Sequence, residues 1–323
     1  MTIRDAGENS TTAHWLAETF SLGRALDLKR VARGAMGEVC QLITTSGRYA
    51  AKRYYWPDGL PHAEFSEVFA ERCRGLGVPV PEVHRDRSGA LLVQAKGGAW
   101  WQLADWVSGS KPVAGDADSA RWLVRQTARI HSIGQRPDWD AHLDPFYASC
   151  AVDWSALAAR ARCAGADWAG QLTERVEEFT QLGAWASSVP VGELRISHND
   201  LTLDNVLVSG GSRWLIDWDN VGPQDPIREL GVQLAAVLSD PDLVRDLVRI
   251  YCAAGGAEFR WSEGIFASAF VIRLNYLAVQ IETLLDAAQL EHHDFARTQV
   301  VPLLRDVPSM SGLDEQLAAV ELP

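Results

Sequence analysis

The most informative part of the sequence runs from residue 196 to residue 219 and reads ISHNDLTLDNVLVSGGSRWLIDWD. Two short apolar runs, at residues 205–208 and 213–216, flank the tetrapeptide Ser-Gly-Gly-Ser. Glycines in a short turn between two apolar runs are typical of a β-hairpin. The sequence therefore predicts a two-stranded ribbon over this part of the chain.

Polar residues precede the first strand of this predicted hairpin and follow its second strand. Asp200 and Asn205 come just before its first strand and Asp217 just after the second, so the ribbon brings all three to one end. A carboxylate there can accept a proton from a hydroxyl group, while an amide oxygen and a second carboxylate suit Mg²⁺ that carries nucleotide phosphates. The alternative is a plain turn with a strand-end aspartate. Four polar residues at these offsets, His198 included, favour a catalytic site.

Two motifs in this stretch resemble the catalytic signature of the aminoglycoside phosphotransferase family. The first is His198-x-Asp200-x-x-x-x-Asn205, and about a dozen residues later comes Ile-Asp217-Trp-Asp219. The family consists of small-molecule kinases with a protein-kinase-like fold. The resemblance implies that Asp200 is the catalytic base and that Asn205 and Asp217 bind Mg²⁺, with ATP or GTP as co-substrate. His198 and Asp219 are then supporting residues.

Composition and charge are those of a globular protein with a substantial core. The chain has 323 residues, of which 47% are hydrophobic and 22% charged, and its net charge is −12. The length favours two lobes that share one cleft. The negative charge makes nucleic acid and anionic membrane surfaces poor partners, and it favours a small cationic molecule as the phosphate acceptor.

The N-terminus, the cysteines and the longest apolar stretch all favour a cytoplasmic protein. Residues 1–12 are polar and lack the apolar core of a signal peptide. Five scattered cysteines show no CxxC pair and no metal-ligand spacing, as expected in a reducing compartment. Residues 264–285 include Arg273, Asn275 and Glu282, so they predict a buried helix rather than a membrane span.

The residue pattern of the N-terminal third predicts mainly short β-strands. An amphipathic helix is expected at residues 13–20, and strands are expected at residues 26–33, 39–45 and 48–55. Gly34 and Gly37 lie between the first two strands, where kinase-like folds place the loop over the nucleotide phosphates. Glycines there let backbone N–H groups approach phosphate oxygens closely, although the same pattern also suits a simple hairpin turn.

Lys52 ends a Tyr-Ala-Ala-Lys run that resembles the Val-Ala-Ile-Lys strand of protein kinases. The resemblance implies that this lysine contacts the α- and β-phosphates of the nucleotide. A carboxylate is needed to hold it, and the helix predicted over residues 61–76 offers three glutamates along one face. Glu67 fits best by its distance from the Val-Pro-Val-Pro segment at residues 78–81, which follows this helix in similar sequences. Glu64 and Glu71 remain open.

The adenine-binding segment is placed at Asp105, Trp106 and Val107. Strands at residues 80–84 and 90–95 complete the small sheet before it. In the family a strand passes here into the linker between the lobes, and its backbone hydrogen-bonds the adenine edge. An edge strand with packed tryptophans is the alternative.

Taken as a whole, the sequence predicts an α+β protein with a two-lobe, protein-kinase-like fold. The N-terminal nucleotide-binding lobe, residues 1–108, is a small antiparallel sheet plus one helix. The C-terminal catalytic and substrate-binding lobe, residues 109–323, is mainly helical around the catalytic hairpin. The boundary falls where Gly, Ser and Pro cluster. Helices in the second lobe are expected at residues 118–133, 154–164, 171–185, 227–254, 262–288 and 291–307.

Three further residues of the second lobe have expected local roles. His131 lies on an amphipathic helix and is expected to be a core or capping residue. Asp225 is expected to cap the next helix, with Glu229 in the first turn of that helix.

The sequence does not identify the acceptor. Enzymes similar to this one phosphorylate aminoglycosides, homoserine, choline, fructosamines or sugars, and the acidic charge favours an amine-bearing acceptor. Asn199 stands where many antibiotic kinases have Gly, which keeps a small-metabolite kinase as the runner-up to an antibiotic-resistance role. A nucleotide-binding pseudokinase is a further alternative. Against it, the lysine, the base and both metal ligands are all present.

Overall fold

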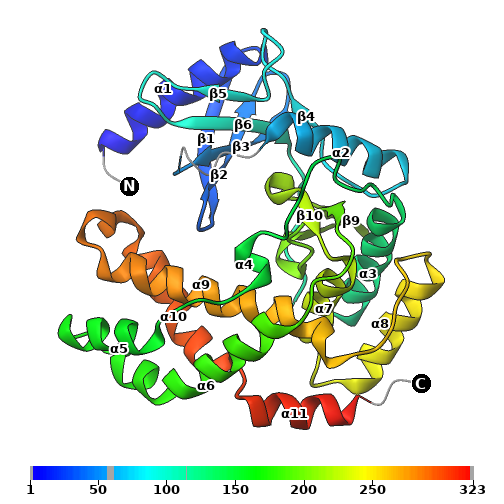
Figure 1. The fold of residues 1–323 in the computed structure, drawn as a ribbon. Helices are drawn as coiled ribbons and strands as arrows, with labels where there is room; N and C mark the ends of the chain where they lie inside the picture. The colour runs from blue at the N-terminus through cyan, green and yellow to red at the C-terminus, as the bar shows by residue number, and fades with distance from the viewer. Residues whose placement is uncertain (1–2, 57–61, 114, 321–323) are drawn as a thin grey trace. The chain divides into compact units, whose positions relative to one another are not determined.

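A computed structural model describes residues 3–56, 62–113 and 115–320 (Figure 1). The chain forms two compact units. The first unit comprises Met1–Val113 together with Leu203–Val221, and the second comprises Ala114–Thr202 and Gly222–Pro323.

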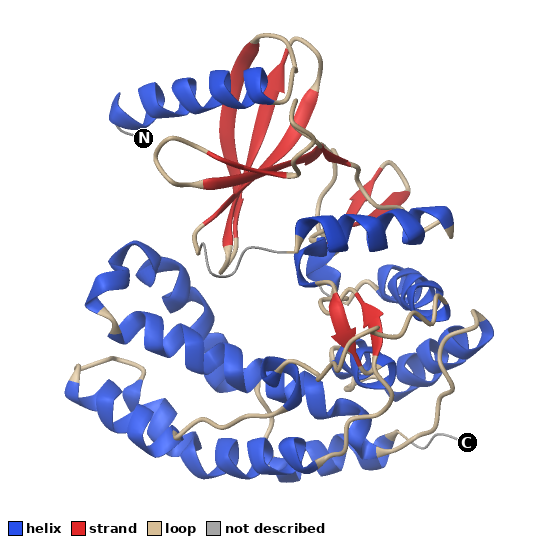
Figure 2. Cartoon of the chain, turned by 45° about the horizontal axis from the view of Figure 1, so that its top comes forward, coloured by secondary structure: helices blue, strands red, loops and turns tan. Residues whose placement is uncertain are grey.

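The first unit is built on a six-stranded antiparallel sheet (Figure 2). Its strands are ordered β1-β2-β3-β6-β4, and β5 also pairs with β6. The elements are α1 (Ile3–Thr19), β1 (Ala25–Arg33), β2 (Gly37–Thr44), β3 (Arg48–Tyr54), α2 (Ala63–Gly75), β4 (Val83–His84), β5 (Leu92–Gln94) and β6 (Trp100–Asp105). The strands expected from the sequence are therefore confirmed close to their predicted positions.

The core of this unit lies between α1 and the sheet. Leu16 of α1 and Phe20, which directly follows this helix, pack in one cluster with Leu28, Leu42 and Leu103 of the strands. The helix begins at Ile3, whereas the sequence predicted only residues 13–20. The apolar face that marks a helix starts at Ala13, and the polar residues before it continue the helix without a hydrophobic period.

The predicted catalytic hairpin is confirmed and belongs to the first unit. It consists of the 3₁₀ turn η2 (Leu203–Asn205), strands β8 (Val206–Ser209) and β9 (Ser212–Leu215), and the 3₁₀ turn η3 (Trp218–Asn220). Ser209 pairs with Ser212, which leaves Gly210 and Gly211 as a two-residue turn. Their φ angles are +54° and +87°, the left-handed values that such hairpin turns require and glycine adopts without strain.

Backbone hydrogen bonds tie this hairpin to the segments around the sheet. Ser110 and Val208 exchange two bonds, of 3.1 and 2.8 Å, and Leu215 N–H donates to the Pro79 carbonyl at 2.9 Å. The sequence division assigned the hairpin to the C-terminal lobe, with a boundary after residue 108. In the structure these bonds group the hairpin with the N-terminal sheet instead.

The second unit is mainly helical, as the sequence predicted. A two-stranded ribbon of β7 and β10 leads into its central helices. The elements are α3 (Ala117–Ser132), α4 (Pro145–Ala148), α5 (Trp154–Cys163), α6 (Ala169–Ser188), β7 (Arg195–Ser197), β10 (Gly222–Gln224), α7 (Pro226–Ala235), α8 (Pro241–Ala253), η4 (Glu263–Phe266), α9 (Ala267–Leu285), η5 (Ala287–His292), α10 (His293–Asp306) and α11 (Met310–Ala319). The predicted helix at 227–254 is two helices, because Asp240 caps a new one that Pro241 begins.

Helix α9 is at the centre of this unit and packs against α6, α7 and α10 (Figure 1). Its residues Phe270, Leu274 and Ile281 are buried in the core. By length and composition alone, Glu263–Leu285 is apolar enough to cross a membrane, but 61% of its most apolar stretch is buried inside the structure. The prediction of a buried core helix is therefore confirmed.

Candidate active site

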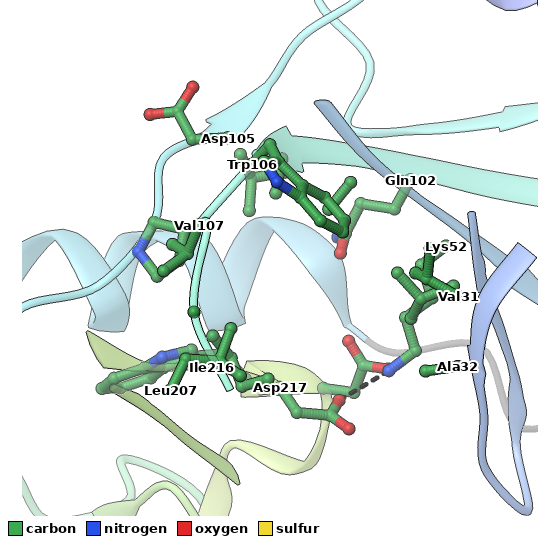
Figure 3. Close-up of a pocket in the computed structure, with 18 of the residues that line it drawn as sticks. Val31, Ala32, Lys52, Gln102, Asp105, Trp106, Val107, Leu207, Ile216 and Asp217 are labelled. Carbon is green, nitrogen blue, oxygen red and sulfur yellow. Dashed lines mark hydrogen bonds and ion pairs between the residues drawn. The ribbon is translucent and has the colours of Figure 1, made fainter. Parts of the chain in front are cut away.

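A pocket with a cavity volume of about 400 Å³ opens within the first unit (Figure 3). Most of its walls are apolar, and its charged lining residues are Lys52, Lys111, Glu67, Asp105, Asp217 and Asp219. Figure 3 shows Val107 and Leu207 on one side and Lys52, joined to Asp217, on the other. The apolar lining includes Val31, Val39, Ala50, Ala104, Leu207 and Ile216.

Lys52 is held by two carboxylates that follow the hairpin. Its Nζ lies 2.5 Å from Asp217 Oδ1 and 2.5 Å from Asp219 Oδ2. The Tyr54 hydroxyl donates to the other oxygen of Asp219 at 3.0 Å. Burial opposes the charge on Lys52, but the two carboxylates outweigh it and raise the pKa of the lysine. The ammonium group is therefore permanently charged at neutral pH.

The predicted pairing of Glu67 with Lys52 is wrong in this structure. Glu67 lines the pocket, but its carboxylate accepts a hydrogen bond from Arg74 of the same helix. Arg74 also donates to the Pro81 carbonyl at 3.3 Å, which fixes the guanidinium next to Glu67. The ammonium of Lys52 is meanwhile satisfied by the two aspartates.

The other two glutamates of α2 do not hold the lysine either. Glu64 forms a two-pronged ion pair with Arg85, with distances of 2.7 and 2.8 Å. Glu71 is exposed. A carboxylate beside Lys52 was correctly expected. The two carboxylates come from Asp217 and Asp219, which are 165 and 167 residues away in the sequence.

Gly34 and Gly37 flank a two-residue turn between β1 and β2, and they differ in their steric requirement. A Cβ on Gly37 would lie 2.2 Å from the Arg53 carbonyl oxygen, because β3 passes close beside it. A Cβ on Gly34 would meet no atom nearer than 3.9 Å. Only Gly37 is demanded by close backbone approach.

We expect Gly37→Ala to destabilise the protein by about 1–3 kcal/mol, since the strand must shift to admit the methyl group. Gly34→Ala serves as the matched control and should change the free energy of unfolding by less than about 0.5 kcal/mol. Thermal unfolding of both variants against wild type measures the difference. Equal destabilisation by the two substitutions would contradict the steric argument.

Asp105, Trp106 and Val107 all line the pocket. The Asp105 carboxylate pairs with His84 Nε2 at 2.8 Å and, in Figure 3, points away from Lys52. The backbone N–H of Asp105 donates to the Glu82 carbonyl. Within the described residues the backbone N–H groups of Trp106 and Val107 have no protein partner, so they are available to a ligand in the pocket.

Asn205 and Asp217 both lie at the open end of the hairpin, as predicted. The Ile216 N–H donates to the Asn205 carbonyl at 2.9 Å, which brings the residue after β9 next to the residue before β8. Asp217 has a φ of +64°, a left-handed conformation that Asp and Asn tolerate better than most residues. Its carboxylate already binds a cation, the ammonium group of Lys52.

This donor set fits Mg²⁺ bound through a ligand's phosphates. Carboxylate and amide oxygens are hard ligands, and Mg²⁺ is commonly held by one or two carboxylates plus phosphate oxygens. In the described part of the chain no group of three or more His, Cys, Asp or Glu side chains gathers as a complete metal site. Two oxygen donors of this kind suit a metal whose remaining ligands are phosphate oxygens.

Asp200 and His198 belong to the second unit, where a buried carboxylate fixes their loop. Glu229 of α7, 2% exposed, accepts bonds from the Asn199 N–H at 2.7 Å and from the Ser197 hydroxyl at 2.5 Å. Asn199 has a φ of +66°, a conformation that explains why Gly or Asn suits this position. His131 Nε2 lies 2.7 Å from the same carboxylate.

His198 is fully buried, and its Nδ1 accepts a hydrogen bond from the Asp200 N–H at 3.2 Å. The Asp200 side chain remains partly exposed. Burial raises the pKa of the Tyr147 phenol, and the negative charge of Asp200 adds to this effect. The structure therefore presents Asp200 at the end of a rigidly held loop.

Sequence reasoning missed the role of Glu229 and the contact of Tyr54 with Asp219. It placed Glu229 only in the first turn of a helix, and it correctly predicted Asp225 as the N-cap, which accepts from the N–H groups of Ile227 and Arg228. The sequence signal for a buried role of Glu229 was its position directly before the apolar, core-facing residues of α7. His131 is confirmed as a core residue, 1% exposed.

Comparisons with known proteins agree with this geometry. A sequence model described as "Phosphotransferase enzyme family" matches residues 27–263. A search of curated proteins found no match.

Several solved structures share the fold at low sequence identity. A spectinomycin phosphotransferase in complex with ADP and spectinomycin is 14% identical, with 97% of this chain and 98% of that chain covered and a TM-score of 0.67. A microcompartment-associated aminopropanol kinase is 18% identical, with coverage of 97% and 99% and a TM-score of 0.57. An amicoumacin kinase in complex with AMP-PNP and Ca²⁺ is 12% identical, with coverage of 95% and 97% and a TM-score of 0.58.

These likenesses confirm the predicted kinase-like fold, and the family match spans well over half of the sequence. The chain belongs to the phosphotransferase enzyme family.

Proposed function

We propose that this phosphotransferase moves the γ-phosphate of ATP, or of GTP, to a hydroxyl group of a small amine-bearing acceptor such as an aminoglycoside. The observation that supports this most directly is the pocket of the first unit, which combines apolar walls with Lys52, Asp217 and Asp219. A nucleotide has the matching form, since a flat base is joined to a chain of negative phosphates. The family match supports the reaction class.

The base of the nucleotide would lie against the segment after β6. The backbone N–H groups of Trp106 and Val107 can donate to a purine edge, and Asp105 lines the pocket beside them. Lys52 would neutralise the phosphates, beneath the loop that Gly34 and Gly37 flank. Adenine and guanine both fit this description, so the structure favours neither.

Asn205 and Asp217 would hold Mg²⁺ that accompanies the nucleotide. When bound, the metal supplies positive charge at the β- and γ-phosphate oxygens, where negative charge develops during transfer. Asp219 keeps Lys52 in place through its own ion pair, which leaves Asp217 able to turn to the metal.

Asp200 would orient the acceptor hydroxyl and take its proton. The hydroxyl oxygen forms a bond to the γ-phosphorus as the bond from that phosphorus to the bridging oxygen breaks, and the nucleoside diphosphate leaves. Glu229 and His198 hold the loop that carries Asp200, so little reorganisation is needed at the moment of reaction.

An amine-bearing acceptor is supported by the net charge of −12 and by the relatives that share the fold. Those structures include a spectinomycin phosphotransferase and an aminopropanol kinase, and aminopropanol is an amino alcohol. The same name supports the runner-up, a kinase of a small metabolite such as homoserine, choline, a fructosamine or a sugar.

We also place the enzyme in the cytoplasm, without a membrane or nucleic-acid partner. All five cysteines lie within the described residues and are free thiols, as in a reducing compartment. Among the described residues, one helix is apolar enough to span a membrane, and it is largely buried in the second unit.

The lysine's partner is a testable part of this proposal. We expect Asp219→Asn to raise the Kd for Mg·ATP about tenfold, roughly 1.4 kcal/mol, because it leaves the partly buried ammonium with one partner that the metal also needs. Glu67→Gln is the matched comparison and should change the Kd by less than about twofold. Calorimetric titration measures both. A larger effect of Glu67→Gln than of Asp219→Asn would contradict the assignment.

The function is tested by following γ-phosphate transfer from Mg·ATP and Mg·GTP to aminoglycosides, amino alcohols and sugars, with Asp200→Asn alongside. Transfer to one class that is lost in the variant would establish both the acceptor and the base. Nucleotide binding without transfer to any compound would favour a pseudokinase. If the folded protein bound neither nucleotide, the proposal would fail.

A further inference from the structure

The turn between β1 and β2 is held in place by the indole of a tryptophan that lies outside the recognised sequence motifs. The turn consists of Ala35 and Met36, and it is closed by a hydrogen bond from the Gly34 N–H to the Gly37 carbonyl at 2.8 Å. Trp56, which follows β3, donates its indole N–H to the Ala35 carbonyl at 3.2 Å. The residue before it, Tyr55, donates its backbone N–H to the Met36 carbonyl at 3.0 Å.

These contacts fix the orientation of the peptide groups in the turn. In a planar trans peptide the carbonyl and the following N–H point in opposite directions. The Ala35 carbonyl points to the indole of Trp56, so the Met36 N–H points away from it. Within the described residues no protein partner is found for the N–H of Ala35 or Met36. An unpaired backbone N–H group in a turn can donate to an anionic oxygen.

We propose that Trp56 is a positioning residue, which locks the Ala35–Met36 peptide so that the Met36 N–H meets a phosphate oxygen of the bound nucleotide. This inference rests on the proposed function, since it takes the turn to lie over the phosphates. It adds a residue outside the recognised motifs. Without the indole bond the peptide can rotate, and the turn then presents a carbonyl oxygen as readily as an N–H to the negative phosphates.

The test compares ligands with and without phosphates. Trp56→Phe keeps a ring of similar shape and removes only the N–H donor and part of the packing. We expect it to raise the Kd for Mg·ATP about five- to tenfold, the loss of roughly one oriented, charge-assisted hydrogen bond. The Kd for adenosine, which has no phosphate, should stay within about twofold of wild type. Calorimetric titration gives both values.

Trp15→Phe is the matched control, because it makes the same substitution on α1 of the same unit, where Trp15 packs against the core. It should leave both affinities unchanged. If Trp56→Phe bound Mg·ATP as tightly as wild type, or lost affinity for adenosine equally, the positioning role would be refuted. If wild type bound neither ligand, the proposed function would fail instead.

A second measurement uses the wild-type protein and so does not depend on how the variant folds. Amide hydrogen exchange of Met36 should slow when Mg·AMP-PNP binds and remain unchanged with adenosine. Exchange at Met36 that is indifferent to Mg·AMP-PNP, in protein that binds it, would overturn the proposal.

Discussion

Asp200→Asn should lower kcat for phosphoryl transfer about 10²- to 10⁴-fold, which corresponds to roughly 2.7–5.4 kcal/mol of lost transition-state stabilisation. Asn has nearly the same size as Asp but cannot accept the proton. The bonds that hold the loop use the backbone N–H of Asp200 and of Asn199, so they survive the substitution. The KM for the nucleotide should therefore stay close to the wild-type value.

Steady-state kinetics with any acceptor that the wild type uses will measure this effect. Asp242→Asn is the control, because Asp242 lies on α8 in the same unit and is 93% exposed. It should leave kcat unchanged. An Asp200→Asn enzyme with kcat within about tenfold of wild type would show that another group takes the proton.

Asp217→Asn should reduce kcat/KM by at least about 10²-fold and raise the Mg²⁺ concentration needed for half-maximal activity. The substitution removes a charge at the metal, a contribution worth several kcal/mol in phosphoryl transfer. It is a clean change, because Asn adopts the left-handed conformation of Asp217, with its φ of +64°, without added strain. Lys52 keeps Asp219 as a partner.

Titration of activity with Mg²⁺ distinguishes a metal ligand from a purely structural residue, since excess metal should recover part of the lost rate. Asp27→Asn is the matched control, as Asp27 lies on β1 in the same unit and is exposed. Wild-type turnover and wild-type Mg²⁺ dependence in Asp217→Asn would refute the metal assignment.

The parts that the sequence predicted correctly are those set by local chemistry. Two consecutive glycines fixed the hairpin turn, and the strands on either side placed Asn205 next to Asp217. The strand that carries Lys52 and the helical pattern of α2 were predictable for the same reason. Hydrophobic periodicity and turn residues carry this information within a few positions.

The partner of Lys52 could not be read in the same way. Three glutamates on one helix face are equivalent in sequence, and which of them reaches the lysine depends on tertiary packing. In the structure Glu67 and Glu64 form ion pairs with arginines. The ammonium group of Lys52 forms its ion pairs with aspartates of a segment that is distant in the sequence. The function of Glu229 was hidden for a related reason, since its partners come from β7 and its loop and from α3.

The grouping of the hairpin with the N-terminal sheet also depends on contacts far apart in sequence. The bonds of Val208 to Ser110 and of Leu215 to Pro79 cross about a hundred residues or more. Composition marks the Gly-, Ser- and Pro-rich region as a boundary but does not show which later segment returns to it. Long-range backbone pairing decides the compact units here.

The central claim is that the pocket of the first unit binds a nucleotide through Lys52. The most direct measurement is calorimetric titration of the protein with Mg·ATP, without acceptor, for wild type, for Lys52→Met and for the control Lys29→Met on an exposed position of β1. We predict that wild type and Lys29→Met bind with a Kd between about 1 µM and 1 mM, and that Lys52→Met binds at least about tenfold more weakly. A folded wild type that does not bind, or a Lys52→Met variant that binds equally well, would contradict the claim.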